Sequence, residues 1–512
     1  MNRHGLESMK RSSRKSILHL AFIAISLLVL SSAIFTGCKN EKKENANEWK
    51  KLIGNDKDRP DLILAFQAEI HTNLYARAVE KFNRENNCKV ALLRVKKEML
   101  MEPLQDAMEL GGDVPDLVEL LEGTMGYFAD GPIEDVGFVD LTDRLREDGY
   151  MDLDNIVLNC YSPWSACGHI FAIPHYVHPV ALCYRVDLIR KLGIDVTKLK
   201  TWNDFVKVGR EITGEWEESD EYAHITKGSK RYMIDLDDNS MVSLQVLLSQ
   251  RGLNLFDANG NVAFDNPEMA ELIAWYIHQT CGVDRISTPA GDGQNFYNAM
   301  KNGHDLFFFT PDWRTMQYTM DLNFDSPSSF LRGKLALMPM PVWADENGDR
   351  LPGTYGTGTW GGMGLAITKH CKNQELAWKL AKYLYLEAGE DDFVYNFQKT
   401  NILPAVKRVW SAREFNEASP YFWQMVRNDQ GNLNVVPISI GRFYASIADD
   451  TAPRYFTAQT SEAEREIMQI IYDVRGFYES HQTDSDVDER MLELIRKKLK
   501  ESADRIRSSQ GK

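Results

Sequence analysis

The sequence predicts an α/β fold with more than one domain. Its 512 residues exceed what one hydrophobic core usually supports, so two or three domain-sized units are expected. A short apolar run at 61–66 is followed by an amphipathic helical pattern and then by a second strand-like run at 89–95. This β-α-β order implies a right-handed crossover between parallel strands, and therefore a parallel sheet.

Residues 1–37 have the pattern of a lipoprotein signal peptide, and residues 38–59 that of a polar tether. A basic start precedes an apolar run at 17–34, and small residues lead into Cys38. Cys38 is therefore the expected site of the lipid that anchors the protein to a bacterial membrane. An uncleaved anchor is the alternative, since the apolar run is about long enough to span a bilayer. Either interpretation places the rest of the chain outside the cytoplasm.

The chain is acidic, with a formal net charge of −15. Removal of residues 1–37, which carry five Lys or Arg and one Glu, would lower this charge to −19. Nucleic-acid binding depends on neutralising phosphates, so we expect no nucleic-acid partner. The content of 43% hydrophobic and 26% charged residues is typical of soluble globular proteins and excludes a multi-span membrane protein.

Of the seven cysteines, the six after Cys38 lie in the part expected outside the cytoplasm, where disulfides can form. Cys160 and Cys167 are close enough in sequence to close a loop. Buried free thiols are the alternative for most of the six. No CxxC pair is present, so neither a zinc ribbon nor a thioredoxin-like site is supported.

Helix-start signals and paired amphipathic patterns mark several further elements. Thr201 and Asp204 form a predicted capping box, and Asn266 and Asn373 are predicted N-caps. Residues 461–506 read as two amphipathic helices.

Short motifs follow one another in a defined order along the chain. In chain order they are 82–86 (FNREN), 111–119 (GGDVPDLVE), 172–174 (AIP), 184–188 (YRVDL), 201–204 (TWND), 264–268 (FDNPE), 361–367 (GGMGLAI), 377–384 (AWKLAKYL) and 401–405 (NILPA). This order resembles that of extracellular solute-binding proteins of the maltose-binding-like, sugar-binding family of ABC importers. Arg185 stands where the family usually has Asn, at a turn.

The resemblance implies a two-lobe periplasmic-binding-protein fold of type II, with discontinuous lobes joined by a multi-strand hinge. Lobe 1 would comprise 60–173 and 362–400, and lobe 2 would comprise 174–361 and 401–512, including the C-terminal helices. It also implies a monomer that captures a small solute, namely a mono- or oligosaccharide, and delivers it to ABC importer permease subunits. No cofactor, no metal and no catalysis are expected from such a protein.

Candidate ligand-binding residues come from strand ends and from the lobe junctions. In open α/β sheets ligands meet the carboxyl ends of the strands, which suggests Gln67, Glu69 and Glu119, unless these are solvated loop residues. Aromatic side chains could cover the apolar face of a sugar ring. At the predicted junctions these are Tyr176, Trp313, Tyr355 and Trp360, accompanied by His175 and Gly361. Neighbouring Pro and Gly residues are expected to place Trp313 and Trp360 at loop ends, although core packing is the usual fate of a tryptophan.

Motifs for dinucleotide, calcium or metal binding are each incomplete or in the wrong sequence context. The glycines at 356, 358 and 361 have dinucleotide-motif spacing but precede a strand, and the stretch 257–261 lacks the Glu of a calcium loop, so a turn is expected. His175 and His178, with His169 nearby, could share a metal only from a turn, and ordinary hydrogen bonding is the preferred interpretation.

Two other function classes stay open on the sequence alone. A secreted carbohydrate-active enzyme needs only two well-placed carboxylates, which sequence cannot exclude. A related two-lobe fold could also bind amino acids, polyamines or a metal. The sequence does not identify the ligand.

Overall fold

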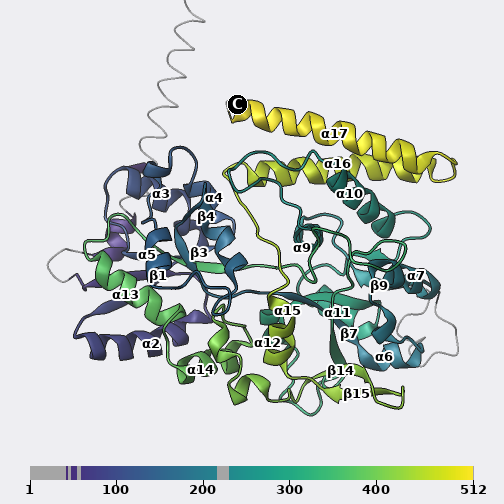
Figure 1. Cartoon of the computed structure of the whole chain (residues 1–512), viewed down its shortest axis with the longest axis horizontal. Coiled ribbons are helices and arrows are strands. Elements are labelled where there is room, and N and C mark those ends of the chain that lie inside the picture. Colours follow the sequence, from purple (N-terminus) through teal and green to yellow (C-terminus); the bar gives the residue numbers. More distant parts are fainter. Residues whose placement is uncertain (1–41, 44–47, 55–58, 216–229, 511–512) are drawn as a thin grey trace, which may run out of the picture.

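The computed structural model describes residues 42–43, 48–54, 59–215 and 230–510 (Figure 1). The predicted signal peptide, Cys38 and most of the tether lie outside this range, as does most of the polar segment at 214–230. Among the described residues, no helix combines the length and apolarity needed to cross a membrane. The chain forms two α/β bodies that lie beside each other, each built on its own sheet (Figure 1).

The first sheet has five strands in the order β2-β1-β3-β13-β6. Their bounds are β1 Leu62–Phe66, β2 Val90–Arg94, β3 Leu117–Leu121, β6 Ala172–Pro174 and β13 Met363–Ile367. β1 pairs in parallel with both β2 and β3, which confirms the predicted β-α-β unit, while β13 pairs antiparallel with β3 and β6. Pro174 ends the edge strand β6, where its missing N–H breaks no ladder.

The second sheet has eight strands, and seven of them follow the order β10-β9-β11-β7-β12-β14-β15. These are β7 Val180–Arg185, β9 Lys230–Asp235, β10 Ser287–Thr288, β11 Asp305–Pro311, β12 Leu335–Pro339, β14 Phe422–Arg427 and β15 Leu433–Pro437, with β8 Gly214–Glu215 on β9. A small hairpin, β4 Ser165–Ala166 and β5 His169–Ile170, stands apart.

Helices cover both sheets. Beside the first sheet the chain forms α2 His71–Asn86, α3 Glu102–Glu109, α4 Thr124–Phe128, α5 Thr142–Glu147 and α13 Gln374–Tyr385. The others are α6 Val186–Lys191, α7 Trp202–Ile212, α9 Val242–Gln250, α10 Pro267–Thr280, α11 Gln294–Asn302, α12 Asp312–Asp321, α14 Glu390–Thr400 and α15 Ile440–Ala448. The predicted starts are confirmed: Thr201 and Asp204 form a capping box, and Asn266 and Asn373 accept N-cap hydrogen bonds.

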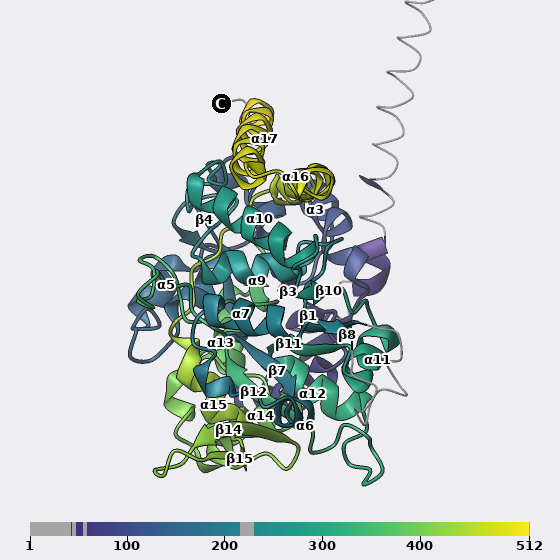
Figure 2. The ribbon, with the colours of Figure 1, turned by 90° about the vertical axis from the view of Figure 1, so that its right-hand side faces the viewer.

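The two predicted C-terminal helices are α16 Thr460–His481 and α17 Val487–Ser509. They pack against each other and against α10, and they lie across one end of the molecule (Figure 2). Ile467, Ile471, Met491 and Ile495 are buried in this contact, as their helical spacing predicts.

Three segments join the two bodies. They are residues 175–179 between β6 and β7, 359–362 before β13, and 401–404 after α14. Isolated bridges tie these segments to one another, between Tyr176 and Pro404 and between Pro179 and Thr359. The α/β fold with two bodies and a multi-segment hinge is therefore confirmed.

The structure tests three local predictions, on the stretch 257–261, on the cysteines and on Trp313. The stretch 257–261 is a turn, because an Asp257 carboxylate oxygen accepts the N–H groups of Asn259 and Asn261. The six cysteines from Cys88 to Cys371 are free thiols, so Cys160 and Cys167 do not close a loop. Trp313 lies in the first turn of α12 rather than at a loop end, because the chain enters this helix directly after Pro311.

Candidate functional site

A cavity of about 440 Å³ lies between the two bodies. One wall comes from the first body, with Ile70, His71 and Leu121, and the opposite wall is α12. The floor consists of the hinge residues Tyr176, His178, Gly361, Gly362 and Ile402, together with Met363 at the start of β13. A largely apolar hollow with a few polar groups, placed at a junction of domains, is the usual form of a small-molecule site.

The α12 wall presents Trp313, Met316, Gln317, Met320 and Asp321 to the cavity. The first four are spaced i, i+3, i+4 and i+7, which is one face of a helix. Asp321 accepts a hydrogen bond from the Tyr297 hydroxyl at 2.5 Å. Four of these five residues were missed in the sequence because Pro311 was interpreted only as the end of a strand; the helical spacing that follows it was the available signal.

Trp313 is held in place by its neighbours. Its indole N–H donates to the Trp360 carbonyl oxygen at 3.2 Å, and the two rings meet edge to face with centroids 5.7 Å apart. The Arg314 guanidinium lies 4.9 Å from the centre of the Trp360 ring. Trp360 therefore supports Trp313 and does not itself line the cavity.

A buried aspartate ties the hinge to α12. Asp312 is fully buried, and its Oδ1 lies 2.8 Å from His178 Nδ1 and 2.7 Å from the Trp313 backbone nitrogen. Its Oδ2 accepts the Leu403 N–H at 2.7 Å. His178 adopts a positive φ of 56°, which is uncommon for a residue other than glycine. One carboxylate thus connects two of the three hinge segments to the helix that bears Trp313.

Glu119 is buried and does not line the cavity. Its Oε1 accepts the backbone N–H groups of Gln67 and Ala68, and its Oε2 lies 2.5 Å from His71 Nδ1 and accepts the Tyr75 hydroxyl at 2.7 Å. Burial alone raises the pKa of Glu119, but His71 and the hydrogen bonds outweigh it and lower that pKa to about 2. Glu119 is therefore an ionised carboxylate that fixes the loop after β1.

His175 lies deeper than the cavity. Its ring stacks on the Tyr385 ring at a centroid distance of 3.8 Å and an angle of 8°. Burial lowers the pKa of His175 well below the usual value, so the ring is neutral. The following residue, Tyr176, does line the cavity.

The structure brings three of the nine predicted ligand residues into the cavity wall: Tyr176, Trp313 and Gly361. Glu69 is exposed and forms an ion pair with Arg94, and Tyr355 packs near Gly252. Gln67, Glu119, His175 and Trp360 lie around the wall without forming it. With no ligand present, the assignment of all nine residues to ligand binding stays a prediction.

Two α/β bodies, three hinge segments and an interposed cavity define a binding protein of the two-lobe type II periplasmic fold. Residues 67–391 match the family described as bacterial extracellular solute-binding protein. The chain belongs to this family, whose members act outside the cytoplasm.

The chain is similar to curated sugar-binding relatives and shares its fold with a solved structure. An arabinooligosaccharide-binding protein of Bacillus subtilis is 23% identical over 406 residues, covering 77% of this chain and 82% of the relative. Another protein of that name, from Halalkalibacterium halodurans, is 22% identical over 460 residues, covering 86% and 93%. The sugar-binding protein MalE of Xanthomonas citri superposes with a TM-score of 0.62 at 16% identity, covering 87% of this chain and 98% of its own.

Proposed function

We propose that this protein captures an oligosaccharide in the cavity between its lobes and delivers it to the permease subunits of an ABC importer. The observation that carries the proposal is the position of Trp313 and Tyr176, two aromatic residues on the walls of one cavity. An aromatic face covers the apolar face of a sugar ring, and polar groups such as Gln317, His178 and Asp321 can bond its hydroxyls. The names of the curated relatives support arabino-oligosaccharides as the first compounds to test.

Lobe closure about the hinge would trap the sugar, and the closed form would be the one that the permease recognises. The break between β6 and β7 supports lobes that comprise 60–173 with 362–400, and 174–361 with 401–512. We also propose a monomer attached to the membrane through lipid on Cys38. These features rest on the family resemblance and on the sequence pattern before the described residues.

A thermal-shift screen of residues 39–512 would test the proposed function. Arabino-, malto- and galacto-oligosaccharides are compared with amino acids and polyamines, and hits are titrated by calorimetry. We expect one oligosaccharide class to raise the melting temperature at a stoichiometry of one, because a ligand that binds the folded chain stabilises it. Stabilisation by amino acids or polyamines alone would contradict the sugar assignment.

The same incubations separate binding from turnover. The cavity lining includes a single carboxylate, Asp321, whereas hydrolysis of a glycosidic bond commonly uses two. We therefore expect the sugar to be recovered intact by chromatography after prolonged incubation. Cleavage products that are absent from a heat-denatured control would favour the carbohydrate-active enzyme instead.

A further inference from the structure

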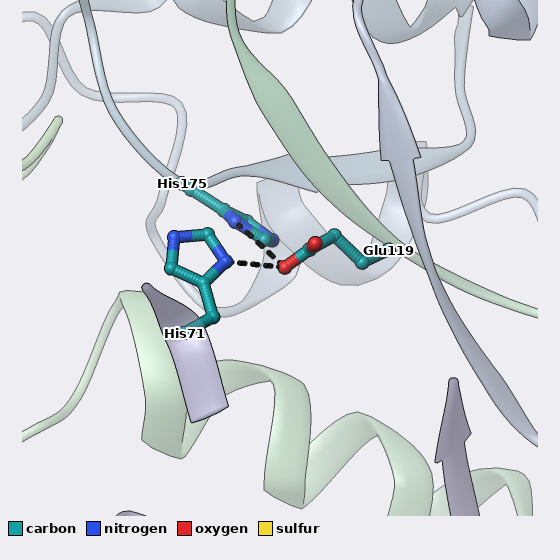
Figure 3. Close-up of side chains that lie close together, drawn as sticks. All are labelled: His71, Glu119 and His175. Atoms are coloured by element: carbon teal, nitrogen blue, oxygen red, sulfur yellow. Dashed lines mark hydrogen bonds and ion pairs between the residues drawn. The ribbon is translucent and has the colours of Figure 1, made fainter. Parts of the chain in front are cut away.

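Three buried side chains lie close together (Figure 3), and one of them, His71, also lines the cavity. His71 is the first residue of α2, Glu119 lies in β3, and His175 follows β6. One candidate ligand atom from each lies within 4.8 Å of the others. Their side chains are 3%, 0% and 0% exposed, so bulk water does not solvate them.

His175 is the unexplained member of this cluster. Neither of its ring nitrogens has a hydrogen-bond partner among the described residues, although both are buried. An unsatisfied buried polar group destabilises the folded state, and folded proteins satisfy nearly all such groups with protein, water or an ion. Its Nδ1 lies 3.9 Å from Glu119 Oε2, which is too far for a hydrogen bond.

An ion between these atoms would supply the missing partner. Zinc binds imidazole nitrogen at about 2.0–2.1 Å and carboxylate oxygen at about 2.0–2.2 Å, so two ligand atoms of one ion lie roughly 3–4 Å apart. The His175–Glu119 separation of 3.9 Å falls within this range. His71 Nδ1, now 2.5 Å from Glu119 Oε2, would have to retreat by less than about 1 Å as the ion replaces the proton between them.

A metal needs an ionised carboxylate and neutral imidazoles, so zinc binding here would release the proton that lies between His71 and Glu119.

We propose that His71, Glu119 and His175 bind a zinc ion, with water or a ligand oxygen in the fourth position. Two imidazoles and one carboxylate form a donor set typical of zinc sites that keep an open position. The ion would link α2, β3 and the hinge segment, next to Tyr176 in the cavity wall. The site adjoins the sugar cavity, because His71 also lines that cavity, but the zinc assignment does not depend on the proposed function.

The test is zinc binding to residues 39–512 after treatment with a chelator. We expect one equivalent of zinc by calorimetry and by elemental analysis, and a higher melting temperature of the zinc-loaded chain. The diagnostic variant is His175→Phe, which removes both nitrogens but keeps an aromatic ring on Tyr385. It should weaken zinc binding by at least about 100-fold, since even the loss of an outer-sphere partner costs about 10–100-fold.

The matched control is His169→Phe. His169 also pairs with a carboxylate, Asp140, but its side chain is 44% exposed and belongs to no cluster of three candidate ligands among the described residues. This variant should bind zinc as the wild type does. A wild-type chain that binds less than a tenth of an equivalent, or a His175→Phe chain that binds normally, would overturn the proposal.

X-ray absorption of the zinc-loaded wild type keeps the proposal testable if His175→Phe fails to fold. We expect scattering from two imidazoles and from oxygen at about 2.0–2.2 Å. Sulfur scattering, or a single imidazole, would place the ion elsewhere and refute the assignment.

Discussion

His178 Nδ1 and Asp312 Oδ1 lie 2.8 Å apart, and this buried contact joins a hinge segment to the helix that forms one wall of the cavity. The Asp312 carboxylate also accepts the N–H groups of Trp313 and Leu403, so it sets the position of both the aromatic wall and the third hinge segment. Hinge geometry and cavity geometry are therefore determined by the same side chain.

Asp312→Ala should lower the free energy of unfolding by about 3–5 kcal/mol, since removal of one partner leaves His178 and two backbone N–H groups buried without an acceptor. Chemical denaturation measures this loss. The control is Asp143→Ala, whose side chain is 83% exposed and paired with Arg146; it should change stability by less than about 1 kcal/mol. Equal effects of the two variants would contradict the role assigned to Asp312.

Trp313→Ala should weaken oligosaccharide binding by about 1–3 kcal/mol, or roughly ten- to a hundredfold in Kd, because the variant loses the stacking face. Calorimetry measures the affinity, and the melting temperature of the ligand-free chain is recorded on the same sample. Unchanged affinity of a destabilised chain would show that Trp313 is a core residue and not a ligand contact.

Trp360→Ala provides the comparison for Trp313. Since Trp360 packs behind Trp313 and its backbone carbonyl oxygen accepts the Trp313 indole N–H, loss of the Trp360 ring should mainly reduce stability. Any loss of affinity should be smaller than that in Trp313→Ala. The reverse order would place the ligand against Trp360.

Ionisation of Asp235 should lower the stability of the folded protein as pH rises from about pH 4 to about pH 7. Burial and nearby Asp305 raise the pKa of Asp235 from 3.8 to about 7. The folded state therefore binds a proton that the unfolded state has released in this range, and the stabilisation is lost as pH rises through the folded pKa. The effect should be about 3–4 kcal/mol, at roughly 1.4 kcal/mol for each pH unit between the two pKa values.

Asp235→Asn isolates this contribution, because the amide keeps the shape and cannot ionise. The free energy of unfolding of the variant, minus that of the wild type at the same pH, should increase as pH rises from about pH 4 to about pH 7. A difference that stays constant across this range would contradict the raised pKa.

Cys38→Ala should abolish lipid attachment, because the thiol of this residue is the acceptor that the signal pattern predicts. Metabolic labelling with a radioactive fatty acid and membrane fractionation measure the change. Labelling that persists in the variant would refute the lipobox interpretation.

Much of the fold was accessible from the sequence because its signals are local. Three kinds of prediction depend only on residues a few positions apart, and all are confirmed. They are the capping box of Thr201 and Asp204, the N-caps at Asn266 and Asn373, and the paired C-terminal helices. The motif order likewise led to the two-body architecture. Trp313 was assigned to the correct region but to the wrong kind of element, since a proline after a strand is compatible with a loop or with a helix start.

What the tertiary structure alone decided is which side chains share an environment. Glu69 and Glu119 were both predicted from their positions near strand ends. In the structure Glu69 is 84% exposed, whereas Glu119 is buried and takes part in four hydrogen bonds. His71, Glu119 and His175 are far apart in the chain, and only the packing of α2, β3 and the hinge brings them together. Sequence patterns specify local elements because backbone preferences are local, whereas a site made by elements of two bodies exists only once those bodies are packed.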